Sequence, residues 1–176
     1  EQNACEAERY INTILDKTLI EVKNMLHLGS GAGILDYTFK KHFKITGIDL
    51  SDGMIDVART INPEVNYIKG DMRYFKLDGQ FDTVIIPDSL FYMVSEEDLC
   101  LALHNASRHL KPGGVLLLVC HYREVFQNNN FVYTGSAEGI DITVFENNYI
   151  LDKDRTLYEA TIVYLIRKGS DLEIFT

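Results

Sequence analysis

The hydrophobic and polar positions of this chain follow two different patterns, one before about residue 130 and one after it. In the first part, segments with apolar residues three and four positions apart alternate with short, continuous apolar runs, which is typical of helices alternating with buried strands. The first helix is expected over about residues 4–19, where Ile11, Ile14 and Leu15 share one face. This order predicts a doubly wound α/β fold with a mostly parallel, Rossmann-like sheet and helices on both faces.

Five buried strands and three further helices are predicted within this part. The strands are expected at residues 22–28, 44–50, 66–71, 81–86 and 115–120. The helices are expected at about 35–42, at 52–60 behind the capping residue Ser51, and from Ser95 to about residue 110. The segment "KPGG" is expected to end the last helix, because proline cannot continue a helix and glycine permits the turn.

From Phe131 onward the pattern changes to strand, turn, strand, with no helical period. The runs 141–151 and 156–166 are rich in β-branched and aromatic residues, and a turn at 168–170 precedes a last run at 171–175. Such runs predict an antiparallel meander. We therefore expect two domains, residues 1–127 and residues 128–176. The second domain is interpreted as a wall of a substrate pocket or as an oligomer contact, such as that of a homodimer.

Composition and charge narrow the classes of function. The longest purely apolar run has six residues, 115–120, and no signal peptide is visible, so no membrane association is expected. Three cysteines without CxxC spacing indicate a reduced, cytoplasmic protein and no metal site. A formal net charge of −9 disfavours a nucleic-acid partner, because an acidic surface repels phosphates. A small-molecule substrate is the better hypothesis.

Candidate chemistry lies where the predicted strands end. In an open α/β sheet a ligand binds beyond the carboxyl ends of the strands, near the point where the strand order reverses. The first four strand ends carry, in chain order, the glycine loop 29–33, then Asp49, then Asp71, Met72 and Arg73, and finally Pro87, Asp88 and Ser89. Glycine lets a ligand lie directly on the backbone, and an acid after the second strand can accept both hydroxyls of a ribose. Taken singly, each residue could also be an ordinary turn, surface or core residue.

The spacing of the glycines separates two kinds of cofactor. A dinucleotide-binding loop has the spacing G-x-G-x-x-G, whereas this loop reads G-x-G-x-G and has Ile34 at the sixth position. That spacing is poor for a pyrophosphate and suits a cofactor that ends in a zwitterionic amino acid. A dependence on NAD is therefore disfavoured.

These motifs, in this order, resemble those of the class I S-adenosylmethionine-dependent methyltransferases over about residues 22–120. "LHLGSGAG" is similar to the first motif of that family, "ITGIDLSDGMIDVAR" to the second, "YIKGDMRYF" to the third, "FDTVIIPDSLFYM" to the fourth, and "LKPGGVLLLV" to the turn and strand that follow. "GDMR", "LFYM" and the meander look most like small-molecule N-methyltransferases, including those that act on amino sugars and glycine. "IPDS" lacks the signature of the DNA and RNA amino-methyltransferases.

The resemblance implies S-adenosylmethionine as cofactor and methyl transfer to a small acceptor, with an amine nitrogen as the expected target. The cofactor residues that it implies are Gly29, Ser30, Gly31, Gly33, Asp49, Leu50, Met54, Asp71, Met72 and Pro87. The substrate side is expected at Asp88, Phe91 and Tyr92. His121 and Tyr122 follow the fifth strand and are either a base for an incoming amine or residues of the rim without a catalytic role.

Two features depart from the family. His27 stands where relatives usually have Asp or Glu, and a neutral histidine supplies no negative charge to the charged tail of the cofactor. If the missing charge weakens binding, His27→Asp is expected to tighten it; alternatively, His27 is a polar residue with its hydrogen bonds satisfied at the end of a buried strand. The closing helix and hairpin of the family are not recognised after residue 120, so missing terminal residues are expected. Together these departures keep an alternative open, a non-catalytic methyltransferase-like binding or scaffolding module.

Overall fold

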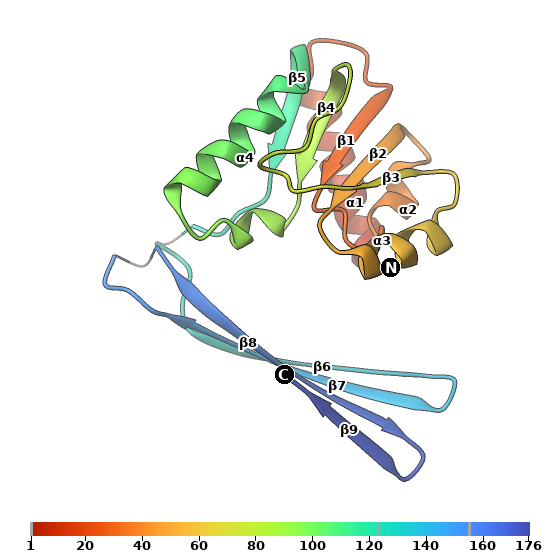
Figure 1. Cartoon of the computed structure of the whole chain (residues 1–176), viewed down its shortest axis with the longest axis vertical. Coiled ribbons are helices and arrows are strands. Elements are labelled where there is room, and N and C mark those ends of the chain that lie inside the picture. The colour runs from red at the N-terminus through yellow and green to blue at the C-terminus, as the bar shows by residue number, and fades with distance from the viewer. Residues whose placement is uncertain (1, 123, 155) are drawn as a thin grey trace. The chain divides into compact units, whose positions relative to one another are not determined.

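The structure is a computed structural model that describes residues 2–122, 124–154 and 156–176. Its contacts divide the chain into two compact units, residues 1–120 and residues 121–176, each of which contains one sheet (Figure 1). The boundary between the two units thus lies after residue 120, earlier in the chain than the boundary predicted after residue 127. The two functional domains that were expected from the sequence stay a prediction.

The first unit is a doubly wound α/β fold, as predicted. Its five parallel strands have the order β3-β2-β1-β4-β5. The strands are β1 (Asn24–Leu28), β2 (Lys44–Asp49), β3 (Asn66–Lys69), β4 (Phe81–Ile86) and β5 (Leu110–Leu118). The helices are α1 (Gln2–Lys17), α2 (Asp36–Phe39), α3 (Asp52–Ile61), the 3₁₀ helix η1 (Ser89–Tyr92) and α4 (Glu96–Arg108). The strand order reverses between β1 and β4.

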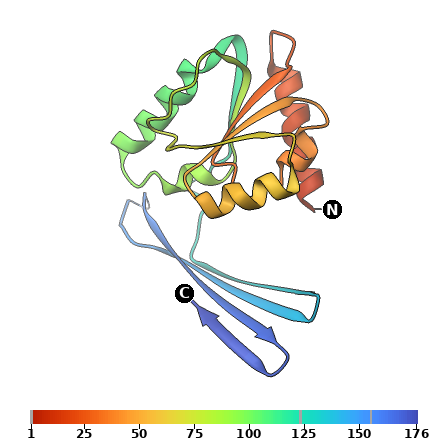
Figure 2. The same ribbon diagram turned by 45° about the vertical axis from the view of Figure 1, so that its right-hand side comes forward.

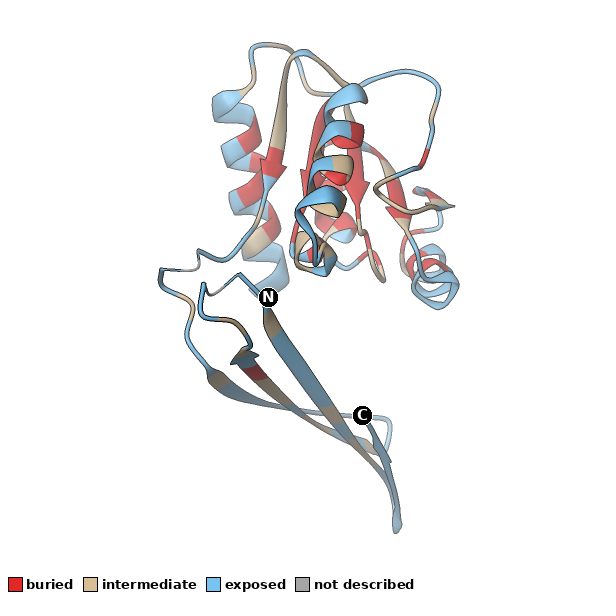
Figure 3. Cartoon of the chain, turned by 60° about the vertical axis from the view of Figure 1, so that its left-hand side comes forward, coloured by how far each residue is buried: buried red, intermediate tan, exposed pale blue. Residues whose placement is uncertain are grey.

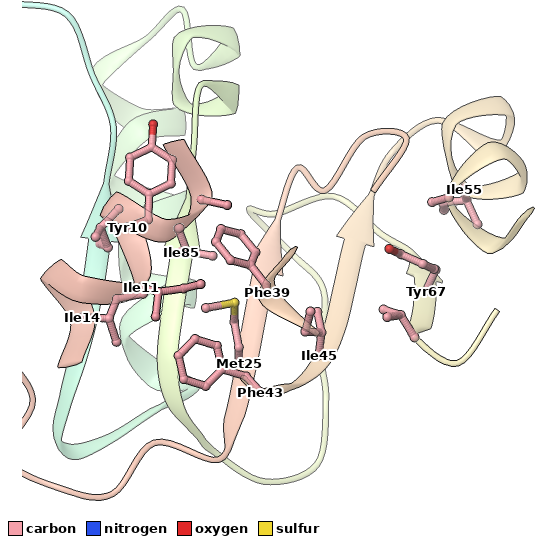
Figure 4. Close-up of a cluster of buried hydrophobic side chains, with 14 residues drawn as sticks. Tyr10, Ile11, Ile14, Met25, Phe39, Phe43, Ile45, Ile55, Tyr67 and Ile85 are labelled. Atoms are coloured by element: carbon pink, nitrogen blue, oxygen red, sulfur yellow. The ribbon is translucent and has the colours of Figure 1, made fainter. Parts of the chain in front are cut away.

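Helices cover both faces of this sheet because successive residues of a strand point to opposite sides. Met25 and Ile85 pack with side chains of α1, α2 and α3, and Figure 4 shows part of this cluster. Leu26 and Val84 pack on the other side, in a cluster with Ala106 of α4. In Figure 2, α1 and α4 accordingly lie on opposite sides of the strands. The central strands are therefore buried on both faces, as Figure 3 shows.

The last helix and the fifth strand depart from the expected boundaries. α4 ends at Arg108, and β5 begins at Leu110, which pairs with Phe81, rather than at residue 115. The register between β4 and β5 then shifts between Phe81 and Thr83. Gly113 has a positive φ of 84°, and a side chain at Gly114 would lie 2.4 Å from a backbone oxygen, so these glycines accommodate an irregular strand. The expectation that "KPGG" ends the helix is wrong.

The second unit is an antiparallel meander, as predicted. Its strands are β6 (Asn129–Ala137), β7 (Ile140–Ile150), β8 (Tyr158–Lys168) and β9 (Asp171–Phe175), which pair in chain order. Glu138 and Gly139 both have positive φ, as a two-residue hairpin turn between β6 and β7 requires. Asn129 starts β6, and its side chain accepts a hydrogen bond from Asn148 of β7. Among the described residues, no helix is long and apolar enough to cross a membrane.

Candidate functional site

A cleft of about 660 Å³ opens at the carboxyl ends of β1, β2 and β4, beside the reversal of the strand order. This is where open α/β sheets bind their ligands. Its lining residues are Gly29, Gly31, Asp49, Leu50, Ser51, Met54, Pro87, Asp88, Ser89 and Tyr92. Eight of them were candidates from the sequence. Ser51 was predicted only as a helix cap, and Ser89 only as a residue at the end of the fourth strand, without a role in binding.

Glycine is required in the loop 29–33 for two separate reasons. Gly29, Gly31 and Gly33 all have positive φ, which glycine adopts without strain. A side-chain carbon at Gly29 would lie 2.0 Å from Ser89 Oγ, so only glycine at this position allows the ends of β1 and β4 to pack this closely. A carbon at Gly31 would meet nothing within 4 Å, and Gly31 lines the cleft. The backbone at Gly31 is therefore open to a ligand.

Asp49 joins the end of β2 to the glycine loop. Its Oδ2 accepts a hydrogen bond of 2.7 Å from the Gly31 backbone N–H, and its Oδ1 accepts one of 2.9 Å from the Ser51 N–H. Each carboxylate oxygen has two acceptor positions, so each keeps one for a ligand. These bonds fix the carboxylate at the wall of the cleft. It can then accept two neighbouring hydroxyl groups without rearrangement.

The end of β4 carries a carboxylate in an unusual backbone conformation. Asp88 has a φ of 56°, which is uncommon for a residue with a side chain and is frequent at functional sites. The next residue, Ser89, holds the turn in place through a hydrogen bond from its Oγ to the Leu28 carbonyl oxygen of β1, 3.1 Å away. Asp88 is exposed and lines the cleft. The structure thus places a carboxylate at the β4 wall of the cleft.

Asp71 is not among the residues that line the cleft, and its carboxylate forms a salt bridge with Arg73. The Arg73 guanidinium contacts both Asp71 oxygens, with Nη2 2.6 Å from Oδ2, and reaches Asp98 Oδ1 at 2.5 Å through Nη1. Hydrogen bonds from Arg73 hold the pKa of Asp71 below its usual value. A bond from Asp71 to an adenine amino group would have to share this carboxylate with Arg73, and the adenine role stays a prediction.

The remaining candidates have other surroundings. Met72 packs against the core on the α4 side of the sheet, and the Ser30 hydroxyl is buried. Gly33 faces Tyr67 and Asn62, and Phe91 belongs to η1 but is outside the cleft lining. His121 and Tyr122 belong to the second unit, where the His121 ring lies near Phe126 and Tyr158. Their catalytic roles stay predictions.

His27 is buried and contacts a carboxyl group that the sequence reasoning did not connect with it. Its Nδ1 lies 2.7 Å from Asp36 Oδ1, and the Tyr67 hydroxyl donates to Asp36 Oδ2 over 2.8 Å. Asn62 Nδ2 donates to the Gly33 carbonyl oxygen at 2.8 Å and to the Tyr67 oxygen at 3.1 Å. Residue 27 itself supplies no carboxylate, but Asp36 of α2 places one beside it. Nothing in the sequence around Asp36 indicates that its side chain contacts His27.

The comparison with protein families decides the assignment. Residues 25–114, just over half of the chain, match the methyltransferase domain family. The chain belongs to this family. The resemblance to class I S-adenosylmethionine-dependent methyltransferases is thereby confirmed. The match runs from β1 into β5 and includes all the residues that line the cleft.

Individual relatives agree with this assignment. An enzyme of Streptomyces venezuelae named dTDP-3-amino-3,4,6-trideoxy-alpha-D-glucopyranose N,N-dimethyltransferase is 32% identical over 117 residues, which are 65% of this chain and 49% of that protein. The crystal structure of DesVI from the same species has a TM-score of 0.88 at 24% identity, over 98% of this chain and 74% of that one. The S-adenosylmethionine-bound structure of CalS10, an amino pentose methyltransferase of Micromonospora echinaspora, has a TM-score of 0.84 at 23% identity, over 99% and 74%.

The structural likenesses show that this fold is shared. The chain spans about half the length of the curated relatives it matches.

Proposed function

We propose that this chain carries the cofactor-binding domain of a methyltransferase that moves the methyl group of S-adenosylmethionine to the amine nitrogen of a small molecule. The observation that carries the proposal is the position of Asp49. Its carboxylate is fixed by the Gly31 N–H at the wall of a cleft in which the Gly31 backbone is open. This combination suits a nucleoside whose ribose meets the acid and whose tail meets the loop.

The cleft fits S-adenosylmethionine in its chemistry. The two free acceptor positions of Asp49 match the two ribose hydroxyls. Leu50 and Met54 line the cleft with exposed apolar side chains that an adenosine would cover. The loop offers backbone and buried polar atoms rather than cations, which agrees with a zwitterionic tail. When bound, the cofactor supplies a methyl carbon activated by a positively charged sulfur.

The protein then has to position the acceptor, exclude water and handle one proton. An amine attacks only as the neutral base, so a protonated substrate must lose a proton before or during the transfer. Asp88 is the carboxylate that the structure places at the β4 wall of the cleft. It can attract an ammonium group and accept its proton, while the walls of the cleft align the nitrogen with the methyl carbon.

An amine acceptor is also supported by the relatives. Two of the curated enzymes that match this chain are named as N,N-dimethyltransferases of dTDP-linked amino sugars. The acidic charge of −9 favours the approach of cationic substrates over phosphate-rich polymers. We therefore infer an amino sugar or a similarly small, polar amine as the substrate class.

A methylation assay tests the proposal. The protein is incubated with S-adenosylmethionine and a panel of amino sugars, each paired with the hydroxyl analogue that lacks the amine, and products are identified by mass spectrometry. Methylation restricted to the amines is the expected result, and Asp88→Asn should lower kcat with a smaller change in cofactor affinity. Asp78→Asn, an exposed turn residue, is the control that should retain activity. Cofactor binding without turnover on any acceptor would favour the non-catalytic module instead.

A further inference from the structure

A buried polar network lies directly behind the glycine loop. It consists of His27 of β1, Asp36 of α2, Asn62 at the end of α3 and Tyr67 of β3, all of which are at least nine-tenths buried. Asp36 is at its centre, with the His27 ring on one oxygen and the Tyr67 hydroxyl on the other. His27 of β1 and Tyr67 of β3 thus meet at the Asp36 carboxyl group of α2, and Asn62 joins the network through the Tyr67 oxygen.

This network holds the loop at two points. Asn62 donates to the Gly33 carbonyl oxygen, and a side-chain carbon at Gly33 would lie 2.4 Å from the Tyr67 hydroxyl oxygen. The first strand adds a third connection, since His27 precedes Gly29 by two residues. A shift of any of these side chains would therefore move the backbone that lines the cleft.

The network also has unused hydrogen-bonding capacity. Among the described residues, three buried side-chain polar atoms have no partner: His27 Nε2, Ser30 Oγ and Asn62 Oδ1. Two of these atoms belong to the network and the third to the loop in front of it. Buried polar atoms are rarely left without a partner, so this concentration behind one loop points to a polar ligand there.

The charge of the network follows from its hydrogen bonds. A carboxylate only accepts, so the His27 Nδ1 carries the proton of their shared bond, and in the neutral ring Nε2 is then an acceptor. Burial, and then the Asp36 charge and its hydrogen bond, hold the pKa of Tyr67 above its usual value, so the phenol stays a donor. With a neutral His27 ring, the Asp36 carboxylate gives the cluster one negative charge, and in a region of low dielectric this charge acts over a longer distance than in water.

We propose that His27, Asp36, Tyr67 and Asn62 are positioning residues that hold the glycine loop and supply the negative charge that the ammonium end of S-adenosylmethionine meets. This inference rests on the proposed function. The carboxylate that the first motif lacks at residue 27 is provided by Asp36, which His27 contacts through Nδ1 two residues before the loop. The histidine then supports the binding site from behind the loop and is not a defect in it.

Two ligands that differ only at the relevant end separate this role from general support of the fold. S-Adenosylhomocysteine has the ammonium and carboxylate groups, and methylthioadenosine keeps the adenosine and sulfur but lacks the amino-acid end. Dissociation constants of both are measured by isothermal titration for the whole chain and for Asp36→Asn, which keeps the shape and removes the charge. Asp82→Asn is the matched control, because Asp82 is also a buried carboxylate but binds the start of β1 at the opposite end of the strands.

The expected result is selective. Asp36→Asn should weaken S-adenosylhomocysteine about tenfold or more, as expected for a lost buried interaction with a charged group, and should change methylthioadenosine less than about twofold. Asp82→Asn should leave both affinities unchanged. Equal weakening of both ligands by Asp36→Asn, or no change in either, would overturn the inference while the proposed function stands. A wild-type chain that binds neither ligand would overturn the proposed function, and the inference with it.

Tyr67→Phe provides a second variant in case Asp36→Asn does not fold. It keeps the ring in the core and removes one donor to Asp36, so we expect a loss of about threefold for S-adenosylhomocysteine alone. A Tyr67→Phe protein with a normal thermal transition and unchanged S-adenosylhomocysteine affinity would contradict the proposed role of the network.

Discussion

The two sheets of this chain have similarly apolar strands but differ in what covers them. In the first unit, helices pack on both faces, and side chains such as Leu26 and Val84 are fully buried. In the second unit, Asn148 is the one described residue that is classed as buried, and side chains such as Phe131, Tyr164 and Ile174 are exposed (Figure 3). An apolar pattern along a strand thus predicts that a sheet forms. It does not establish that the sheet has a core of its own.

The largest effect that this comparison predicts is on the isolated units. Residues 1–120 have two core clusters and should unfold cooperatively when expressed alone. Residues 121–176 alone should show no cooperative thermal transition, because a four-stranded sheet without a buried face lacks the main source of stability. Circular dichroism melts of both fragments measure this. A sharp transition of the second fragment at low concentration would break the comparison.

Single side chains should show the same contrast. Leu26→Ala in β1 creates a cavity in a fully buried cluster and should lower the free energy of unfolding of the chain by about 3 to 5 kcal/mol. Ile174→Ala in β9 removes an exposed side chain and should cost less than about 0.5 kcal/mol. Denaturant titrations of the two variants give both values. Similar losses would mean that the β9 face is covered in solution.

A substitution in the buried network tests how the core of the first unit responds to a second buried charge. His27→Asp would place a second carboxyl group against Asp36 in the core, and two buried carboxylates repel each other. We expect a loss of stability of about 3 kcal/mol and weaker cofactor binding, the opposite of what the sequence led us to expect. Thermal unfolding and titration with S-adenosylmethionine test this. Tighter binding by a stable His27→Asp protein would show that Asp36 does not supply the charge.

A smaller effect is expected from pH. Burial alone would raise the pKa of Asp82, but hydrogen bonds from Lys111 and from the backbone N–H groups of Lys23 and Asn24 lower it to about 2. The unfolded carboxyl group has a pKa near 3.9, so it binds a proton first as the pH falls. Asp82 should therefore stabilise the fold by about 2 kcal/mol above pH 4, a contribution that is lost between about pH 4 and pH 2.

The check is urea unfolding across this pH range for the wild type and for Asp82→Asn. The variant should be less stable at neutral pH, and the difference between the two proteins should disappear toward pH 2. A difference that is independent of pH would contradict the assignment of the charge to Asp82.

Local signals made much of the fold and of the cleft predictable. The glycine loop, Asp49 and Asp88 each follow a continuous apolar run, and the carboxyl ends of parallel strands meet at one edge of the sheet. The start of β5 was not predicted because proline followed by two glycines is also typical of the segment that ends a helix. Only the pairing of Leu110 with Phe81 shows that "KPGG" lies within a strand.

Contacts between distant segments could not be predicted in the same way. Ser89 reaches the Leu28 carbonyl oxygen, and Tyr67 reaches Asp36, across separate elements of the sheet. Each of these residues is ordinary in its own segment, so nothing in its neighbours along the chain indicates its partner. The network behind the loop therefore emerged only once the strands were placed side by side.

The central claim is that the cleft beside Asp49 binds S-adenosylmethionine, and titration calorimetry of the folded chain with this cofactor tests it most directly. We predict saturable one-site binding by the wild type and its loss in Asp49→Ala, because the fixed carboxylate for the ribose is removed. Asp78→Ala, at an exposed turn, should bind as the wild type does. Absence of binding by the folded wild type, or an unchanged affinity of Asp49→Ala, would contradict the account.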